Sequence, residues 1–450
     1  MTTKFLKGIL ASAVIITSCD TAQIDTKSDL NFNNKVQNWL SENNVPAAGI
    51  GIIEDGKVKY ANVIGELKKD IPAPDNAIFN IASLTKPVVA MLTLKLVENG
   101  QWDLDEPLFH YWIDPDISND PLHKKLTTRH VLRHQTGFTN WRRMNQSGKL
   151  TFEFEPGTDY KYSGEGFEYL RKALESKFKK SFMQLSDSVL FKPLDMEDTR
   201  YYWDKNMDES RFAFWHDYKG NLYSPATSKS YGLNAAGSLL TTVGDYCKFG
   251  IDVINGSELS ADILNEMISS ENNSTKSFEQ GLSWEIVRNL PGGEYALVHG
   301  GTDNGVNAVC IFLPHSKRGV VVFTNGDNGR SIWENVIKEI IGDEIFDCIY
   351  KISNIPERVT LSNEILEKYV GEYQDQYGRG LIVSISKEAG AIKVAGDGIG
   401  TFTLYPEAEG KFFQEYSEIK YDFILDNDNN IEIQKRNMDG RIINRARMIK

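Results

Sequence analysis

The chain contains the stretch Phe79-Asn80-Ile81-Ala82-Ser83-Leu84-Thr85-Lys86-Pro87, which continues as an apolar run to Glu98 and stops at Asn99-Gly100. The apolar run predicts a helix, and Asn-Gly is a pair that tolerates the left-handed backbone found where helices end. Pro87 limits the other end, because its ring would clash with the carbonyl of residue 83 in a longer helix. We therefore expect Ser83 at the start of this helix, with Lys86 one turn along on the same face.

Ser83 and Lys86 together predict a nucleophile and its base. A hydroxyl is a poor nucleophile at neutral pH, and a lysine whose pKa is lowered by an apolar pocket can accept its proton. The Ser-x-x-Lys pattern occurs four times in the chain, but only the copy at Ser83 opens a long apolar helix. The alternative is that Ser83 is an ordinary N-cap and Lys86 a solvated lysine of the first turn.

The N-terminus predicts export. Lys4 and Lys7 precede the apolar run 8–16, which is too short to span a membrane as a mature helix. Ile16-Thr17-Ser18-Cys19 resembles a bacterial lipoprotein signal, so we expect residues 1–18 to be a signal peptide, Cys19 the lipidated residue and 19–34 a flexible tether. This places the protein in the bacterial cell envelope, anchored to a membrane through Cys19. The alternative is an ordinary secretory signal cut nearby.

Composition narrows the classes of function. The chain has 450 residues, of which 41% are hydrophobic and 11% aromatic, so it can bury a large core. Its length predicts two domains. Its formal net charge of −12 argues against binding nucleic acid or anionic lipid head groups through the surface. Cysteine and histidine show no metal-ligand spacing, so no metal or cofactor is expected. Apolar neighbours predict buried free thiols at Cys247, Cys310 and Cys348.

The remaining segments up to about residue 350 predict a mixed order of helices and strands. Asp55-Gly56 between two apolar runs is a strong hairpin signal. Tyr162 lies in a loop before a helix. Gly300-Gly301 follow a strand. Two glycines at this position either allow a ligand to pair with the strand edge or form a simple bulge. One expected helix begins at Val36, and others span 126–135, 167–178 and 331–341. The expected strands span 47–53, 58–64, 295–299, 306–313 and 319–324.

From about Ser353 the pattern changes to short alternating strands separated by polar turns, such as Met438-Asp439-Gly440. Their even spacing predicts a small antiparallel barrel or sandwich of about a hundred residues. The expected strands span 368–373, 381–386, 391–395, 401–404, 411–416, 421–425, 431–435 and 442–449.

Three patches in order give the chain a family resemblance: Ser83-Leu84-Thr85-Lys86, Tyr162-Ser163-Gly164 and His299-Gly300-Gly301. Together they resemble the serine β-lactamase and penicillin-binding protein superfamily, in its class C-like branch, and several ordered motifs are far more specific than one. The resemblance implies an α/β (α+β) fold over 35–352, an α/β/α sandwich with an antiparallel sheet and a helical region. The tail 353–450 looks like the lipocalin-like barrel that many members carry.

The resemblance also implies roles for site residues. Ser83 would be the nucleophile, Lys86 its proton acceptor, and Tyr162 a second base that Lys86 acidifies and that passes the proton to the leaving group. The family's Lys-Thr-Gly strand motif would correspond to His299, Gly300 and Gly301. The N–H groups of Ser83 and Thr302 would then stabilise the developing oxyanion.

Two departures from the family pattern bear on the substrate. The usual Tyr-x-Asn is Tyr162-Ser163-Gly164, which lacks the amide, and the usual strand lysine is His299, whose charge is expected to depend on pH. Both favour small ester or amide substrates. We therefore expect a cell-envelope serine hydrolase that forms an acyl-enzyme on Ser83, an esterase or amidase. The alternatives are a D-peptidase or β-lactamase acting on peptidoglycan-like substrates, and a penicillin-binding sensor that deacylates slowly.

Overall fold

The computed structural model describes residues 26–204, 206–224, 229, 232–270, 279–350, 356–386, 388, 390–425, 430–437 and 440–450. The expected signal peptide 1–18 and Cys19 lie outside these residues. None of the helices within the described ranges combines the length and the apolar character needed to cross a membrane.

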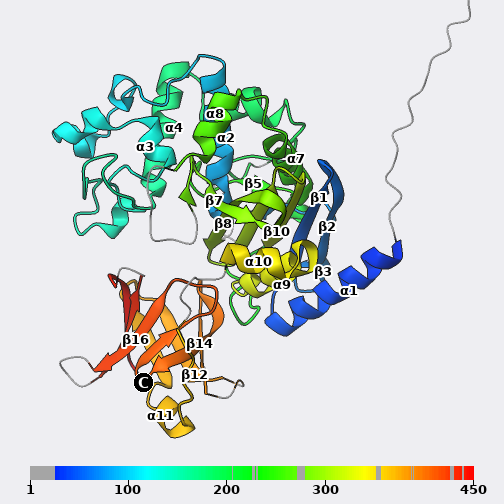
Figure 1. Cartoon of the computed structure of the whole chain (residues 1–450), viewed down its shortest axis with the longest axis vertical. Helices are drawn as coiled ribbons and strands as arrows, with labels where there is room; N and C mark the ends of the chain where they lie inside the picture. Colours follow the sequence, from blue (N-terminus) through cyan, green and yellow to red (C-terminus); the bar gives the residue numbers. More distant parts are fainter. Residues whose placement is uncertain are drawn as a thin grey trace, which may run out of the picture.

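An eight-stranded antiparallel sheet forms the centre of the N-terminal part (Figure 1). Its strands follow the order β3-β2-β1-β10-β9-β8-β7-β6. The central strands β1 and β9 are buried along both faces, which explains their continuous apolar sequence and requires helices on each side. The strands are β1 (Ala47–Glu54), β2 (Lys57–Lys68), β3 (Ile71–Pro72), β6 (Glu279–Gln280), β7 (Glu285–Leu290), β8 (Glu294–Asp303), β9 (Val306–Leu313) and β10 (Arg318–Thr324).

Helices cover both faces of this sheet. On one face α1 (Thr26–Asn43), α9 (Gly329–Ile341) and α10 (Asp343–Tyr350) pack their apolar sides against the strands. On the other face α7 (Val243–Ile254) and α2 (Thr85–Glu98) share the larger core, which continues into a helical region. This region holds α3 (Thr128–Leu132), α4 (Gly164–Phe178), α5 (Phe182–Ser186) and α8 (Ala261–Ile268). The predicted α/β (α+β) sandwich with a helical region is confirmed.

The N-terminal helix is longer than expected. α1 begins at Thr26, inside the stretch 19–34 that was predicted to be a flexible tether, and that prediction is wrong for its second half. Phe32, Val36 and Leu40 recur every four residues, so a helix places them on one face against the sheet. The side chain of Asn33 also accepts a hydrogen bond from the Tyr60 hydroxyl at 2.6 Å.

The cysteine prediction holds for two thiols and is wrong for the third. Cys247 and Cys310 are free and buried, whereas Cys348 is free and exposed. Cys348 lies on α10, where Phe346 and Ile349 face the core. Apolar neighbours in sequence do not share a helix face, and so they gave the wrong signal.

The C-terminal part is a closed eight-stranded antiparallel barrel, as predicted, with each expected strand present. The barrel encloses a core that includes Tyr373, Leu404 and Phe423. Leu366 of α11 (Asn363–Glu367) is buried in the same core. The strands are β11 (Gly371–Asp375), β12 (Gly380–Ile385), β13 (Ile392–Gly396), β14 (Gly400–Ala408), β15 (Lys411–Phe413), β16 (Lys420–Leu425), β17 (Ile431–Arg436) and β18 (Ile442–Met448).

The barrel contacts the sheet domain through α9, α10 and the end of β10, and Figure 1 shows it beside these helices. The Arg330 guanidinium donates to the carbonyl of Tyr416 at 2.9 Å, and the rings of Phe346 and Tyr416 meet edge to face. The N–H of Gly398, in the β13–β14 turn, donates to Asp327 Oδ2 at 2.8 Å. Specific polar contacts therefore orient one end of the barrel toward the sheet domain.

Candidate active site

Ser83 lies in the short 3-10 turn η1 (Ala82–Leu84), directly before α2. Neither η1 nor α2 has a side-chain N-cap, so the interpretation of Ser83 as an ordinary cap is wrong. Lys86 is only 1% exposed, and its Nζ donates to Ser83 Oγ at 3.0 Å and to the carbonyl of Ala236 at 2.7 Å. The serine and lysine therefore form a buried pair, as the spacing predicted.

The backbone around Ser83 is held in an unusual conformation. Ala82 has a φ of 44°, in the left-handed region, which costs an alanine about 1–2 kcal/mol. Asn80 Oδ1 accepts from the N–H of Ala82 at 2.8 Å, and the Thr85 hydroxyl donates to the carbonyl of Ala82 at 2.6 Å. These bonds fix the turn that presents the Ser83 hydroxyl, and strain of this kind is concentrated at functional sites.

Burial sets the protonation of Lys86. Desolvation lowers its pKa from the usual range to about 7, as the apolar surroundings of the helix predicted. The ammonium also lies 4.7 Å from the centre of the Tyr162 ring. At neutral pH a large fraction of Lys86 is therefore a free amine, and this amine is hydrogen-bonded to the hydroxyl of Ser83. Such a pair can transfer the serine proton to nitrogen.

Tyr162 lies in the loop before α4, and its hydroxyl is hydrogen-bonded to Ser83. Ser163 Oγ caps α4 by accepting from the N–H of Gly166 at 3.2 Å, which orients the loop. The expected acidification by Lys86 is wrong for the free protein, because burial raises the pKa of Tyr162 well above its usual value. Tyr162 is therefore a phenol at neutral pH and can donate a proton.

His134 supports Tyr162. Its ring packs on the Tyr162 ring, with the centroids 4.3 Å apart. His134 Nδ1 accepts from the N–H of Ser163 at 3.2 Å. The histidine thus fixes both the ring and the backbone of the tyrosine loop.

The strand β8 brings the second half of the site to Ser83. Its pairing with β7 stops at Val298, so residues 299–303 keep only β9 as a strand partner within the described chain. A Cβ on Gly301 would lie 2.3 Å from the carbonyl oxygen of Ile81 and 3.1 Å from the nitrogen of Ser83. Only glycine permits this approach. Thr302 follows directly, beside the Ser83 turn.

Ser83 and Thr302 line one cavity of about 470 Å³, here called the Ser83 cavity. Gly300 is exposed and Gly301 is buried against the Ser83 turn. The structure thus brings together Ser83, Lys86, Tyr162 and the strand 299–302. Ser83 and Thr302, whose N–H groups are the expected oxyanion donors, thus both lie on the wall of one cavity.

His299 does not carry a pH-dependent charge near neutrality, and the prediction that it does is wrong. The side chain is buried, and burial together with the nearby Lys86 lowers its pKa to about 3. Its Nδ1 lies 2.8 Å from the carbonyl oxygen of Gly300, which can only accept, so Nδ1 holds the proton. The strand motif therefore carries a neutral imidazole, and no cation, across the neutral range.

The amide missing at position 164 has a counterpart nearby. A Cβ on Gly164 would lie 2.6 Å from the Trp141 ring, so the ring fills the space of a longer side chain. Asn140 Oδ1 accepts from the N–H of Gly164 at 2.9 Å, and Asn140 lines the Ser83 cavity. Sequence reasoning missed Asn140, because a loop asparagine carries no signal until its position is known.

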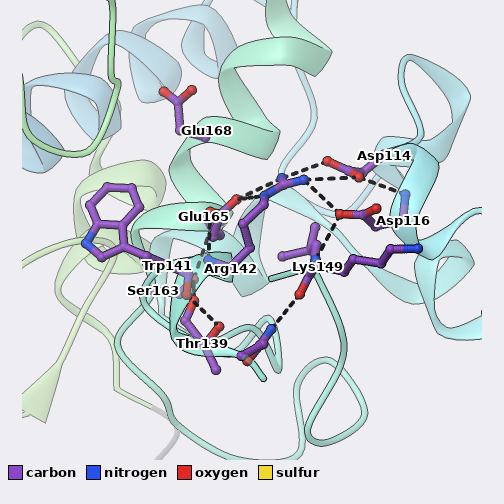
Figure 2. A network of polar contacts seen from close by, with 12 residues as sticks. Asp114, Asp116, Thr139, Trp141, Arg142, Lys149, Ser163, Glu165 and Glu168 are labelled. Atoms are coloured by element: carbon purple, nitrogen blue, oxygen red, sulfur yellow. Dashed lines mark hydrogen bonds and ion pairs between the residues drawn. The ribbon is translucent and has the colours of Figure 1, made fainter. Parts of the chain in front are cut away.

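A network around Arg142 holds the loop that carries Asn140 and Trp141 (Figure 2). The Arg142 guanidinium donates to Asp114 and Glu165, each at 2.8 Å, and to Asp116 at 3.1 Å. Both Asp114 and Glu165 are buried. Since Glu165 belongs to α4, one arginine ties the loop to the helix that follows Tyr162.

Figure 2 also shows Glu168, one turn further along α4. Its Oε1 accepts from the N–H of Ala235 at 2.6 Å. Ala236, the next residue, supplies the carbonyl that accepts from Lys86. The same helix therefore positions the two loops on either side of Ser83.

Comparison with known proteins places these features in a family. A family model described as Beta-lactamase matches residues 32–336. The chain is 22% identical over 413 residues to penicillin-binding protein 4* of Bacillus subtilis (strain 168), which covers 83% of this chain and 89% of that protein.

Solved structures agree on the fold. The octameric penicillin-binding protein homologue from Pyrococcus abyssi has a TM-score of 0.62 at 21% identity and covers 94% of this chain and 100% of that chain. The D-alanine carboxypeptidase AmpC from Burkholderia cenocepacia has a TM-score of 0.58 at 19% identity and covers 70% of this chain and 99% of that chain. Because the family model spans well over half of the sequence, the chain belongs to the beta-lactamase family and is a hydrolase of the β-lactamase and penicillin-binding protein superfamily.

Proposed function

We propose that the protein is a serine hydrolase that forms an acyl-enzyme on Ser83. The observation that carries this proposal is the hydrogen bond between Ser83 Oγ and a buried lysine whose pKa is about 7. An exposed lysine would be protonated at neutral pH and unable to act as a base. A serine without such a partner would remain a weak nucleophile.

In the first half of the proposed reaction, Ser83 Oγ attacks the substrate carbonyl while its proton passes to Lys86 Nζ. The N–H groups of Ser83 and Thr302 stabilise the negative charge on the carbonyl oxygen. The bond to the leaving group then breaks as the Tyr162 phenol donates its proton to the departing oxygen or nitrogen. Lys86 returns its extra proton to Tyr162, so both groups end neutral and the acyl group remains on Ser83.

Water completes the turnover. It attacks the acyl carbonyl and gives its proton to Lys86, directly or through Tyr162. The tetrahedral intermediate collapses, the acid leaves, and Ser83 Oγ regains a proton from Lys86. Because Tyr162 has a raised pKa in the free protein, it acts as a proton donor first and as a base only within the catalytic cycle.

The proposed substrates are small esters or amides, with an esterase or amidase as the first candidate. A neutral His299 offers no cation beside the strand to hold a substrate carboxylate there. A D-peptidase or β-lactamase acting on peptidoglycan-like substrates is the second candidate. It is favoured by Asn140, which keeps an amide side chain in the Ser83 cavity despite Gly164.

The decisive experiment measures turnover of p-nitrophenyl acetate, p-nitrophenyl butyrate and nitrocefin by the form that begins after Cys19. Ser83→Ala is the test variant, and Ser384→Ala, in a Ser-x-x-Lys copy on the barrel, is the matched control. We expect steady ester hydrolysis that is lost only in Ser83→Ala. Ester turnover that survives Ser83→Ala contradicts the assignment. A stoichiometric burst that then stalls identifies a slow-deacylating sensor instead.

We also propose that a lipid on Cys19 anchors the enzyme in the bacterial cell envelope. The proposal is supported by Lys4 and Lys7, the apolar run 8–16 and the position of Cys19 after Ser18. The full chain expressed in bacteria with labelled palmitate should become labelled and sediment with membranes. Cys19→Ala should abolish both results, and labelling that persists in this variant refutes the anchor.

A further inference from the structure

The barrel contains a cavity of about 300 Å³, here called the barrel cavity, at the end that faces the sheet domain. Because neighbouring strands are antiparallel, the turns after β11, β13, β15 and β17 all lie at this end. Gly398, in the turn after β13, donates to Asp327 Oδ2 at 2.8 Å. Asp327, Arg330 and Thr302 of the sheet domain line the cavity. Both domains therefore contribute to the wall of the cavity.

Residues on alternate positions of the strands give the cavity two zones. Ile433 and Ala446 are paired across β17 and β18 and contribute to the apolar wall. Two residues further along the same strands, Lys435 and Asn444 form the next pair on this inward face. The cavity thus changes from apolar inside the barrel to polar at the mouth, where cationic side chains outnumber the carboxylate of Asp327.

Lys435 is the group that this cavity leaves without a counterion. No carboxylate of the described residues lies within ion-pair distance of its Nζ. Burial, and then the positive charges of Arg379 and Arg330, lower its pKa, and the negative charge of Asp375 offsets only part of this effect. A cation that is both desolvated and repelled is costly to keep, and an incoming anion would relieve that cost.

The carboxylate whose charge acts on Lys435, that of Asp375, is already engaged. Asp375 Oδ2 accepts from Arg379 Nε at 2.8 Å and from Asn444 Nδ2 at 3.2 Å. Asp375 is therefore not available to neutralise Lys435 without breaking an existing pair.

Thr302 connects this cavity to the reaction site, because it lines both the barrel cavity and the Ser83 cavity. We propose that the barrel cavity is a second substrate subsite, in which Lys435 binds a carboxylate at the mouth of the barrel while the ester or amide carbonyl of the same molecule lies at Ser83. The inference rests on the proposed function and names its substrate class: acyl compounds that carry a carboxylate on a chain long enough to reach from Ser83 to Lys435. The cation that the strand motif lacks at His299 is thus supplied from the barrel.

The first test measures binding alone, using calorimetry on the full chain with octanoate and, as a neutral probe of equal length, octanamide. Lys435→Gln is the test variant. Lys368→Gln is the matched control, because Lys368 is an exposed barrel lysine that pairs with Glu409. We expect octanoate to bind one to one, and Lys435→Gln to weaken it about tenfold or more, as for the loss of a charge-assisted hydrogen bond. Equal affinity of the wild type and Lys435→Gln for octanoate, or absence of binding, overturns the proposal.

The second test measures the substrate preference with the p-nitrophenyl half-esters of succinate, suberate and dodecanedioate, each against the uncharged p-nitrophenyl ester of matching length. We expect one of the longer half-esters to have a higher kcat/KM than its uncharged counterpart. Lys435→Gln should reduce this preference about tenfold, and Lys368→Gln should leave it unchanged. Octanoate binding that depends on Lys435 without any such preference overturns the subsite. If the wild type shows no Ser83-dependent ester turnover but binds octanoate through Lys435, the proposed function is refuted and the anion site is supported.

Discussion

Burial changes Lys86 from a permanent cation into a group that exchanges its proton near neutral pH. Only the free amine can accept the serine proton, and its fraction rises as the pH passes through the pKa of about 7. We therefore predict that kcat/KM for p-nitrophenyl butyrate rises about tenfold per pH unit in the acidic range and levels off above neutrality. A profile that bends near the usual lysine pKa would contradict this. His299→Gln should leave the bend in place, because His299 is neutral throughout that range.

Gly164 is a position where the family pattern and the packing disagree. Replacing it by asparagine would restore the motif, but the new Cβ would lie 2.6 Å from the Trp141 ring. We predict that Gly164→Asn lowers the free energy of unfolding by about 1–3 kcal/mol and gives no gain in nitrocefin turnover. Urea denaturation and a nitrocefin assay check the two parts. A variant of unchanged stability that hydrolyses nitrocefin faster would show that the ring moves aside easily.

The sequence predicted the pairing of Ser83 with Lys86 and the lowered pKa of Lys86, but it missed the protonation states of Tyr162 and His299. Ser83 and Lys86 could be predicted because residues three apart in a helix share a face. The raised pKa of Tyr162 and the lowered pKa of His299 both come from burial by residues far away in the chain. Asn140 reaches the cavity only through the fold of its loop, and a single sequence carries no sign of it.

At the level of elements, one arginine joins the loop at 139–143 to α4. Arg142→Gln would leave Asp114 and Glu165, whose side chains are 5% and 9% exposed, without their cation. We predict a loss of about 3–5 kcal/mol in the free energy of unfolding, as for a broken buried ion pair, measured by urea denaturation. Arg358→Gln, which removes an exposed pair with Glu415, should change stability by less than about 1 kcal/mol. Equal effects of the two variants would show that the network contributes little.

Predicted elements were correct where a local pattern decides them. The hairpin at Asp55-Gly56 and the helix after Ser83 follow from turn chemistry and apolar periodicity, and both are present. The start of α1 was missed because its N-terminal turns are polar and only Phe32 extends the apolar face. The end of the β7–β8 pairing at Val298, which opens the strand toward Ser83, depends on long-range register and has no local signal.

At the scale of the whole molecule, alternation along the chain was sufficient to predict eight barrel strands. It did not predict which end of the barrel meets the sheet domain, because a few turn residues decide this. Gly398 and Tyr416 make these contacts from turns whose sequences resemble any other polar turn. The barrel cavity and its link to Thr302 therefore became visible only in three dimensions.

Asp327 contacts both the barrel and the turn that follows the catalytic strand β8. Its carboxylate accepts from the N–H of Gly305 in the β8–β9 turn at 2.6 Å, from the N–H of Gly398 at 2.8 Å and from the Tyr223 hydroxyl at 2.8 Å. An asparagine has one oxygen in place of two, so Asp327→Asn must leave at least one of these donors unpaired. An unpaired buried donor costs about 1–3 kcal/mol, which is enough to speed local opening about tenfold or more.

We therefore predict that Asp327→Asn accelerates amide hydrogen exchange in both the β8–β9 and the β13–β14 turns, while β9 keeps its protection. Since the β8–β9 turn continues from Thr302, kcat/KM for esters should fall in the same variant. Tyr223→Phe removes one donor and leaves the carboxylate, so it should have the smaller effect on both measurements. Exchange that accelerates in the β13–β14 turn alone would mean that the barrel is held by Asp327 without influencing the catalytic strand, and the coupling between the two would be refuted.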